Sequence, residues 1–318
     1  MSTSHTDVRD AFFDTICDIG MEDENVFIMS DDMDAFSVRR FKAERPRQFL
    51  DADVAEQNMV NIAAGLAHSG KRVFMFGIAP FVTMRCFEQI KVNICSMNLP
   101  VTIIGMGVGF SFSFDGPTHH GIHDLAVMRA LPEMTIYSPS DASSTAASAR
   151  RAYASDGPVY VRLDKGGYPE LEESAVANDF SDGYRIVRPL QDVNIVASGF
   201  MAPRAIEVSE ELADRGIDVG VVDLYRIKPI GKGFSDAVLS TSRHVITVEE
   251  SCVLGGVGTA VSELATEIDE NVRVTRIGAA DRQSIEYGSR EWFHENNGLD
   301  NNSIIESITK VTVRAPVR

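Results

Sequence analysis

The sequence predicts an α/β protein with two domains, each built on a mostly parallel sheet flanked by helices. Short runs rich in β-branched and aromatic residues alternate with stretches of helical length, and this alternation is typical of parallel sheets. In the first half of the chain the predicted strands are NVFIMS, RVFMFGIA, PVTIIGMG, MTIYSP and VYVRL. The same alternation starts again at VNIVASG, which predicts a second sheet.

The boundary between the two domains is predicted from a stretch that shows neither the helical nor the strand period of hydrophobic residues. Residues 164–190 are rich in glycine, proline and acidic residues, a composition that favours a linker. We therefore expect a first domain over residues 1–185 and a second over residues 191–318. A chain of 318 residues is long enough for two domains that each have a core.

Helix boundaries are predicted from capping residues and turns. Residues 141–155 begin with an aspartate that can cap a helix and end before the turn signal DGP. In the second domain a helix is expected over residues 202–216, and the glycine run at 255–258 opens another. That run resembles part of a dinucleotide fingerprint, but Val261 stands where a third small residue belongs. We therefore do not predict a nucleotide site there.

Composition excludes several classes of partner. Acidic residues exceed basic ones by 46 to 30, which gives a net charge of −16, and no basic stripe interleaved with aromatic residues predicts a nucleic-acid groove. No apolar run approaches the roughly 20 residues of a membrane span, and the first residues lack a signal-peptide pattern. We expect a cytoplasmic protein with no membrane and no nucleic-acid partner. Scattered cysteines without metal-ligand spacing predict buried thiols at Cys17, Cys86, Cys95 and Cys252.

Three stretches of the first domain carry the chemistry. They are DVAEQN from Asp53, APFVTMRCFEQI from Ala79 and FDGPTHHGIHDLAVMRALPEMTIYSPSD from Phe114. Together they resemble the transketolase family of thiamine-diphosphate enzymes, specifically its pyrimidine-binding domain followed by its C-terminal domain. The resemblance covers residues 7–310, and the third stretch is its most specific part.

The resemblance implies a role for several residues. Glu56 would contact the aminopyrimidine of the cofactor, Phe81 would stack near that ring, and Arg85 would lie beside the cofactor face. His119, together with Asp115, would lie in the substrate channel. The expected catalytic residues are Glu56 and His119.

A physical argument supports the assignment of Glu56. Thiamine becomes a nucleophile when its aminopyrimidine reaches the imino form, and a carboxyl group that shares a proton with the ring nitrogen drives this change. Such a carboxyl must be poorly hydrated, so that its charged and neutral forms lie close in energy. The alternative is local, because acidic residues favour the first turn of a helix. Phe81 likewise has an alternative as an ordinary core aromatic.

Three histidines fall close together, at His119, His120 and His123. An i,i+4 pair on a helix can bind zinc, but no third ligand is evident, and the turn signal DGP places these residues on a loop. We predict no metal site in this chain. The resemblance implies that His119 hydrogen-bonds a sugar substrate or transfers protons.

Three basic residues are candidates for binding a substrate anion: Arg85, beside the expected cofactor face, and Arg162 and Lys165 at the end of the strand VYVRL. Ligands of α/β proteins gather at the carboxyl ends of strands, where Arg162 and Lys165 stand. In transketolase relatives an arginine after this strand binds a sugar phosphate, and we therefore prefer Arg162 over Lys165. The alternative is a surface ion pair with one of the many acidic residues.

The sequence departs from the family pattern at two places, which limits the resemblance as a guide to substrate preference. Asp53 stands where the family usually has glycine, and GFSFSFDG replaces a more polar lead into the histidine loop. In addition, no GDG…N segment for magnesium and diphosphate is found, and this absence predicts a divided enzyme. We expect a β-type subunit of a split transketolase that transfers a two-carbon ketol unit between a ketose phosphate and an aldose. An α-type partner would supply the Mg²⁺ and diphosphate site, in a two-plus-two assembly.

Two alternatives remain open at this level. The β subunit of the decarboxylating component of a 2-oxo acid dehydrogenase shares the domain pair and the glutamate, although the loop DGPTHHGIHD favours transketolase. A non-catalytic scaffold derived from such a subunit would need neither Glu56 nor His119 in a cleft. Acceptor chemistry separates the two enzymes, since one uses a sugar aldehyde and the other a lipoyl group.

Overall fold

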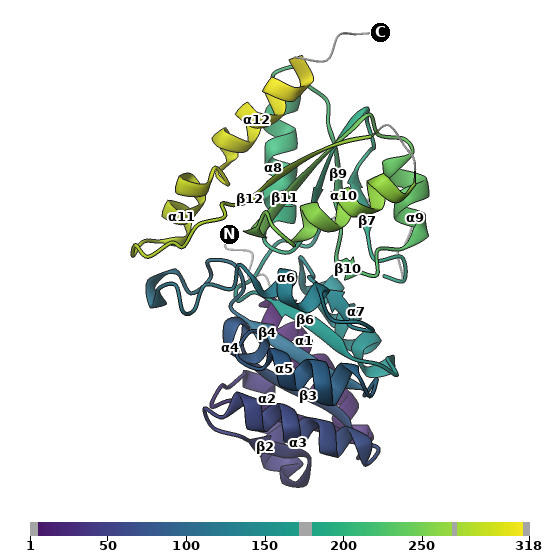
Figure 1. Cartoon of the computed structure of the whole chain (residues 1–318), viewed down its shortest axis with the longest axis vertical. Helices are drawn as coiled ribbons and strands as arrows, with labels where there is room; N and C mark the ends of the chain where they lie inside the picture. The colour runs from purple at the N-terminus through teal and green to yellow at the C-terminus, as the bar shows by residue number, and fades with distance from the viewer. Residues whose placement is uncertain (1–5, 172–179, 269–271, 314–318) are drawn as a thin grey trace.

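Two α/β units lie one above the other along the long axis of the molecule (Figure 1). The computed structural model describes residues 6–171, 180–268 and 272–313. Within them, no helix is both long enough and apolar enough to cross a membrane. The predicted fold class, α/β with two mostly parallel sheets flanked by helices, is confirmed.

The first unit is built on a sheet with seven strands among the described residues. Their order is β10 (Arg226–Lys228), β5 (Thr135–Tyr137), β6 (Val159–Leu163), β4 (Val101–Met106), β3 (Arg72–Ile78), β1 (Val26–Ser30) and β2 (Phe49–Asp51). Neighbouring strands from β5 to β2 pair in parallel, whereas β10 pairs with β5 in the antiparallel sense. The carboxyl ends of the parallel strands therefore meet at one edge of the sheet.

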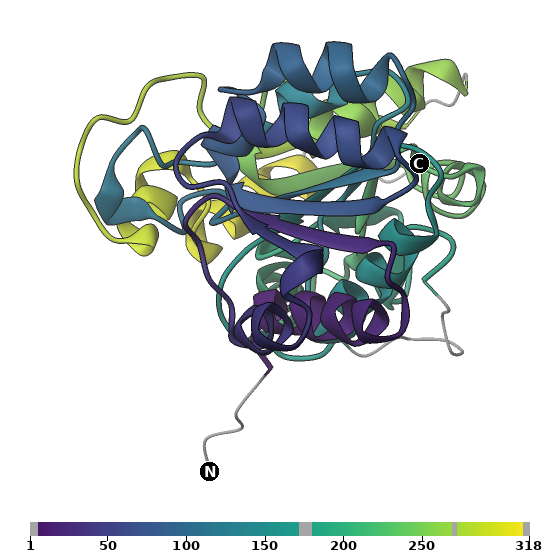
Figure 2. The ribbon, with the colours of Figure 1, turned by 90° about the horizontal axis from the view of Figure 1, so that it is seen from below.

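Helices cover both faces of this sheet, which Figure 2 shows almost edge-on. One face packs against α1 (Val8–Glu22), α2 (Phe36–Glu44) and α7 (Ala142–Ala154). The other face packs against α3 (Glu56–His68), the helical segment Ile90–Cys95 and α6 (Asp124–Arg129). Two shorter helices follow β3 in the chain, α4 (Ala79–Thr83) and α5 (Phe87–Gln89).

The second unit has a smaller sheet, with five strands among the residues described. Their order is β12 (Arg273–Ala279), β11 (His244–Cys252), β8 (Val193–Ala197), β9 (Gly220–Asp223) and β7 (Arg185–Arg188). Only the edge strand β7 is antiparallel to its neighbour within this described sheet. The apolar sides of α8 (Met201–Ala213), α11 (Arg290–Asn297) and α12 (Asn301–Val313) pack on one face. On the other face lie α9 (Lys232–Phe234) and α10 (Val257–Glu267).

The two units share structure across their boundary. Strand β10 follows β9 of the second sheet in the chain but completes the first sheet beside β5. One apolar core also runs through both units, from Met59 and Leu125 of the first to Phe234 and Val261 of the second. The two units are therefore held together by a common core and by an exchanged strand.

The predicted linker at 164–190 differs from the structure at its end. Residues Arg185–Arg188 form β7, an edge strand of the second sheet. Residues 172–179 of the predicted linker, and the chain ends at 1–5 and 314–318, lie outside the described residues. Sequence periodicity missed β7 because four residues are too short a run to show an alternating pattern among charged neighbours.

Other local predictions are confirmed. Helix α7 begins after Asp141, whose side chain accepts a hydrogen bond from the backbone N–H of Ser144. Helix α8 covers most of the stretch expected at 202–216, and α10 begins inside the glycine run. All four cysteines are buried.

Two glycines of the first unit lie in different surroundings, so their replacement by alanine should change stability in opposite directions. A Cβ atom added at Gly105 in β4 would overlap the hydroxyl oxygen of Tyr160, whereas one added at Gly65 in α3 would meet nothing within 4 Å. We expect Gly105→Ala to destabilise the chain by about 1–3 kcal/mol through overpacking. Gly65→Ala should stabilise it by about 0.5–1 kcal/mol, because glycine is unfavourable inside a helix. Urea unfolding measures both, and a neutral Gly105→Ala would contradict the close approach.

Candidate active site

The predicted site residues come from segments that follow the carboxyl ends of the parallel strands. Glu56 is the first residue of α3, which follows β2, and Phe81 lies in α4 directly after β3. His119 belongs to the loop between β4 and α6, and Lys165 follows β6. This edge of an open parallel sheet is where α/β proteins place their ligands.

Glu56 is a buried carboxylate with a single described cationic partner. Its side chain is 2% exposed, and its Oε1 accepts a hydrogen bond from Nη1 of Arg85 at 2.6 Å. The N-terminus of α3 adds partial positive charge at the same place. A carboxylate that is removed from water in this way requires such compensation.

Arg85 connects Glu56 to Phe81. Its guanidinium lies over the Phe81 ring, with the central carbon 4.3 Å from the ring centroid. The Nε2 of Gln57 donates to the backbone carbonyl of Arg85 at 3.1 Å, which ties the Arg85 backbone to the start of α3. A planar group with N–H donors is therefore stacked on Phe81 and hydrogen-bonded to Glu56.

His119 and Lys165 extend this cluster along the same edge. The His119 ring stands edge-on to Phe81, with 5.0 Å between the ring centroids, and its Nδ1 hydrogen-bonds the Thr118 hydroxyl at 3.0 Å. The Phe112 ring also stands edge-on to His119, at 6.4 Å between centroids. The Nζ of Lys165 is 5.0 Å from the centre of the Phe112 ring. The contacts thus run without a break from Glu56 to Lys165.

The other residues of the histidine loop lie in different surroundings. Asp115 is exposed, in a short turn four residues before His119. His120 is buried, its Nε2 lies 3.3 Å from the carbonyl oxygen of Ser113, and burial lowers its pKa. Of these two neighbouring histidines, His119 is the one whose ring contacts Phe81.

Arg162 lies in a position that does not suit the phosphate contact preferred for it from the sequence. Its side chain is buried, its Nε donates to Oδ2 of Asp124 at 2.8 Å, and its Nη2 donates to the carbonyls of Gly121 and Glu250 at 3.0 Å each. The Tyr160 hydroxyl donates to the same Asp124 oxygen at 2.7 Å. Because these partners already hold the guanidinium inside the protein, the structure gives no support to phosphate binding by Arg162.

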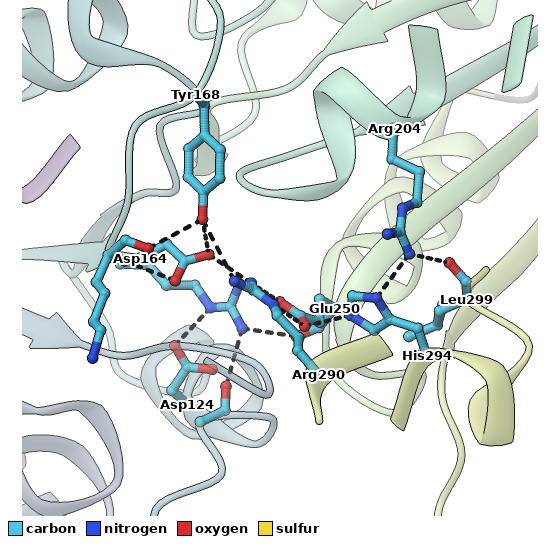
Figure 3. A network of polar contacts seen from close by, with 11 residues as sticks. Asp124, Asp164, Tyr168, Arg204, Glu250, Arg290, His294 and Leu299 are labelled. Carbon is cyan, nitrogen blue, oxygen red and sulfur yellow. Dashed lines mark hydrogen bonds and ion pairs between the residues drawn. The ribbon is translucent and has the colours of Figure 1, made fainter. Parts of the chain in front are cut away.

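A network of polar contacts that the sequence did not indicate joins the two units, and Figure 3 shows it. Arg290 of α11 donates to Asp164 at 2.5 Å and to Glu250 of β11 at 2.7 Å. Glu250 also contacts Nε2 of His294 at 2.6 Å, and Nδ1 of His294 lies 2.7 Å from Nη1 of Arg204. Burial acts to raise the pKa of Glu250, but Arg290 and His294 outweigh it and hold that pKa well below its usual range.

This network fixes the backbone from which Lys165 projects. The Tyr168 hydroxyl donates to Asp164 at 2.6 Å, so Asp164 is held from two directions next to Lys165. Asp164 and Arg290 stand 126 residues apart in the chain, and Glu250 and Arg290 stand 40 apart. Their spacing carries no local pattern, and sequence inspection had no signal with which to find them.

Comparison with known proteins identifies the family. A family model described as the transketolase pyrimidine binding domain matches residues 4–170, and one described as the transketolase C-terminal domain matches residues 183–304. The chain belongs to the transketolase family. It corresponds to two consecutive domains of a transketolase, in the order expected from the sequence.

Relatives of similar length are named as transketolase subunits. The 6-deoxy-6-sulfo-D-fructose transketolase subunit SqwH of Clostridium sp. (strain MSTE9) is 32% identical over 318 residues, which cover 98% of this chain and 96% of the relative. An apulose-4-phosphate transketolase subunit of Phocaeicola vulgatus is 33% identical, over 94% of this chain and 95% of the relative. A solved structure described as a split gene transketolase, inactive β4 tetramer, matches with a TM-score of 0.85 and 32% identity, over 96% of this chain and 97% of that one.

The different surroundings of Arg162, within β6, and Lys165, just beyond it, predict different effects on stability. Arg162→Ala leaves Asp124 buried without its cation, and we expect it to lower the free energy of unfolding by about 3–5 kcal/mol. Lys165→Ala removes an exposed side chain, so its effect should stay within about 0.5 kcal/mol. Denaturant unfolding of the two variants makes the comparison. Equal losses of stability would contradict the assignment of Arg162 to the interior.

Proposed function

We propose that this chain is the β-type subunit of a split transketolase, which transfers a two-carbon ketol unit from a ketose to an aldose acceptor. The observation that carries the proposal is the buried Glu56 carboxylate, which is hydrogen-bonded to a planar group stacked on Phe81. Its full-length similarity to two named transketolase subunits supports the same function.

The residues at this place fit the aminopyrimidine of thiamine diphosphate. The Arg85 guanidinium is a flat group that gives an N–H to Glu56 and a face to Phe81. An aminopyrimidine ring is also flat, and its protonated ring nitrogen is an N–H donor, so it suits the same two partners. Glu56 and Phe81 would hold the ring, with Arg85 beside it. When bound, thiamine diphosphate supplies a nucleophilic carbon that the side chains of a protein lack.

The chain's own residues have distinct roles in this proposal. Glu56 holds a proton between its carboxylate and the ring nitrogen, and its burial excludes the water that would otherwise solvate that proton. Phe81 offers a flat apolar face, which is worth about 0.5–1.5 kcal/mol beyond burial for a stacked ring. His119, beside Phe81, can both donate and accept hydrogen bonds, and so suits a sugar hydroxyl.

Lys165 and Asp115 are the proposed substrate-binding residues farther from the cofactor ring. Lys165 is exposed and lies at the end of the contact series that passes through Phe112 and His119. In a chain with a net charge of −16, a phosphate needs such a local cation. We now prefer Lys165 over Arg162, because Arg162 is enclosed by protein groups.

The diphosphate and the Mg²⁺ are assigned to a partner. The two similar subunits named above are each described as one subunit of a transketolase, which supports an α-type partner for this chain. The β4 tetramer among the similar structures supports self-association. A two-plus-two assembly of α-type and β-type chains accommodates both observations.

The proposal predicts the effect of Glu56→Gln in the assembled enzyme. Glutamine keeps the size of the side chain but cannot share the proton, so we expect turnover to fall by about 10²–10⁴-fold. Proton–deuterium exchange at the thiazolium carbon should slow to a similar extent. NMR after rapid mixing measures the exchange, and the exposed Glu306→Gln is the control that should behave as the wild type.

Wild-type exchange in the Glu56→Gln enzyme would show that the glutamate only begins a helix. The acceptor then separates the two enzyme classes. Transfer to a sugar aldehyde supports transketolase, whereas transfer to a lipoyl group would favour the dehydrogenase subunit. A partner-reconstituted protein that turns over neither acceptor would leave the scaffold as the function.

The assignment of Lys165 predicts a change that depends on substrate charge. Lys165→Ala should raise KM for phosphorylated sugars by about 10–100-fold, because a hydrogen bond to a charged group is lost. KM for the unphosphorylated analogues should change little. Steady-state kinetics measure both, with Lys310→Ala on the exposed side of α12 as the control. An equal rise for both substrate types would remove Lys165 from the phosphate site.

A further inference from the structure

Asp31 is a buried carboxyl group at the same edge of the sheet, and the mechanism above does not use it. It follows β1 directly, and the residue is 7% exposed. Its Oδ1 is buried and has no hydrogen-bond partner among the described residues. A buried oxygen without a hydrogen-bond partner destabilises the fold, so its retention calls for a reason.

The backbone around Asp31 is shaped to admit its carboxyl group. A Cβ atom added at Gly77 in β3 would overlap Oδ2 of Asp31, so only glycine leaves room there. Gly77 is followed by Ile78 and then by α4, which carries Phe81. Asp31 therefore packs where β3 passes into the helix that supplies the ring face of the site.

Asp31 is also electrostatically coupled to Glu56. Burial raises the pKa of Asp31 to about 8, and the negative charge of Glu56 is the next contribution, while backbone hydrogen bonds at Asp31 and Ile78 oppose the rise. Asp51 adds a smaller repulsion. Because Arg85 pairs with Glu56, the proton of the two carboxyls resides on Asp31 and the charge on Glu56.

The remaining groups around this pair do not offer Asp31 a cation of its own. Cys86 packs against the same region, and burial, followed by the charge of Glu56, raises the pKa of its thiol to about 12. Arg85 is the cation among these neighbours, and its described contacts go to Glu56 and Phe81. Asp31 is therefore mainly uncharged below about pH 8, because burial and, after it, the charge of Glu56 both disfavour its ionised form.

We propose that Asp31 is a positioning residue of the active site, which acts through Glu56 as the second member of a buried carboxyl pair. The proposal rests on the proposed function of Glu56 in activating the cofactor. A neutral Asp31 adds no charge next to Glu56, so Glu56 keeps one negative charge to share with a proton donor. An ionised Asp31 places a second negative charge beside it and changes how strongly Glu56 holds a proton.

The pair is tested first in the full chain, without cofactor or partner. Carbon-13 NMR of the aspartate carboxyls follows the titration of Asp31 in the wild type and in Glu56→Gln. We expect a wild-type midpoint far above that of a free aspartate, and a fall of about one pH unit when the Glu56 charge is removed. The exposed Glu263→Gln should leave the midpoint unchanged. An ordinary midpoint in the wild type, or no response to Glu56→Gln, would overturn the pairing.

Thermal unfolding gives an independent measure in the same chain. Because the folded state holds the Asp31 proton above the pH at which the unfolded chain releases it, this group lowers stability progressively from about pH 4 to about pH 8. Asp31→Asn removes that loss. We expect its Tm to exceed the wild-type Tm by several degrees at pH 8 and not at pH 4. A constant difference across this range would contradict a proton on Asp31.

The positioning role is tested in the assembled enzyme through its pH profile. Asp31→Asn, which keeps shape and neutrality, should retain turnover near neutral pH within about tenfold and lose any wild-type decline that follows Asp31 ionisation at alkaline pH. Asp31→Ala, which empties the space over Gly77, should lower turnover at every pH. An Asp31→Asn profile identical to that of the wild type would remove Asp31 from the site. The NMR and unfolding results would stand even if the enzyme proved not to be a transketolase.

Discussion

The arrangement of this chain depends on one constraint, which is that a carboxylate taken out of water needs a cation beside it. Glu56 has Arg85, Asp124 has Arg162, and Glu250 has Arg290. Arg185 forms ion pairs with both Asp141 and Asp223. In a chain with 46 acidic and 30 basic residues, cations used inside the protein are not free for ligands. A buried arginine that pairs with a buried carboxylate therefore has a structural role and is not available to bind a ligand.

The same constraint explains why two basic residues three positions apart behave differently. Arg162 lies within β6, and its side chain enters the space between the two units, where it reaches Asp124 and the carbonyl of Glu250. Lys165 lies beyond the strand. It follows Asp164 in the chain, and the Asp164 side chain is held by hydrogen bonds from Arg290 and Tyr168. The ion network between the units therefore sets the direction of the lysine that we assign to the substrate. Two buried carboxyl groups among the described residues have no ion pair. Asp31 has a carboxylate neighbour and remains buried by keeping its proton. Glu249 instead accepts hydrogen bonds from the backbone N–H groups of Val257 and Gly258.

Three kinds of contact join the two units, and an ion pair is one of them. Strand β10 adds to the first sheet, a common apolar core crosses the boundary, and Arg290 joins Asp164 to Glu250. The carboxyl-end loops of the first sheet are consequently supported by elements of the second unit. A substrate site at this edge gains rigidity from residues that do not touch the substrate.

The sequence by itself determined the fold class, most of the strands, the start of α7 at Asp141, and the motif that contains Glu56, because these depend on local periodicity and capping. It also selected the loop that carries His119. It could not determine which of Arg162 and Lys165 faces the site, since that depends on Asp124 and Glu250, which are distant in the chain. For the same reason β7, the exchanged strand β10, the Arg290 network and Asp31 were visible only in the tertiary structure. Local patterns specify elements, whereas the pairing of buried charges is decided only when separate elements are brought together.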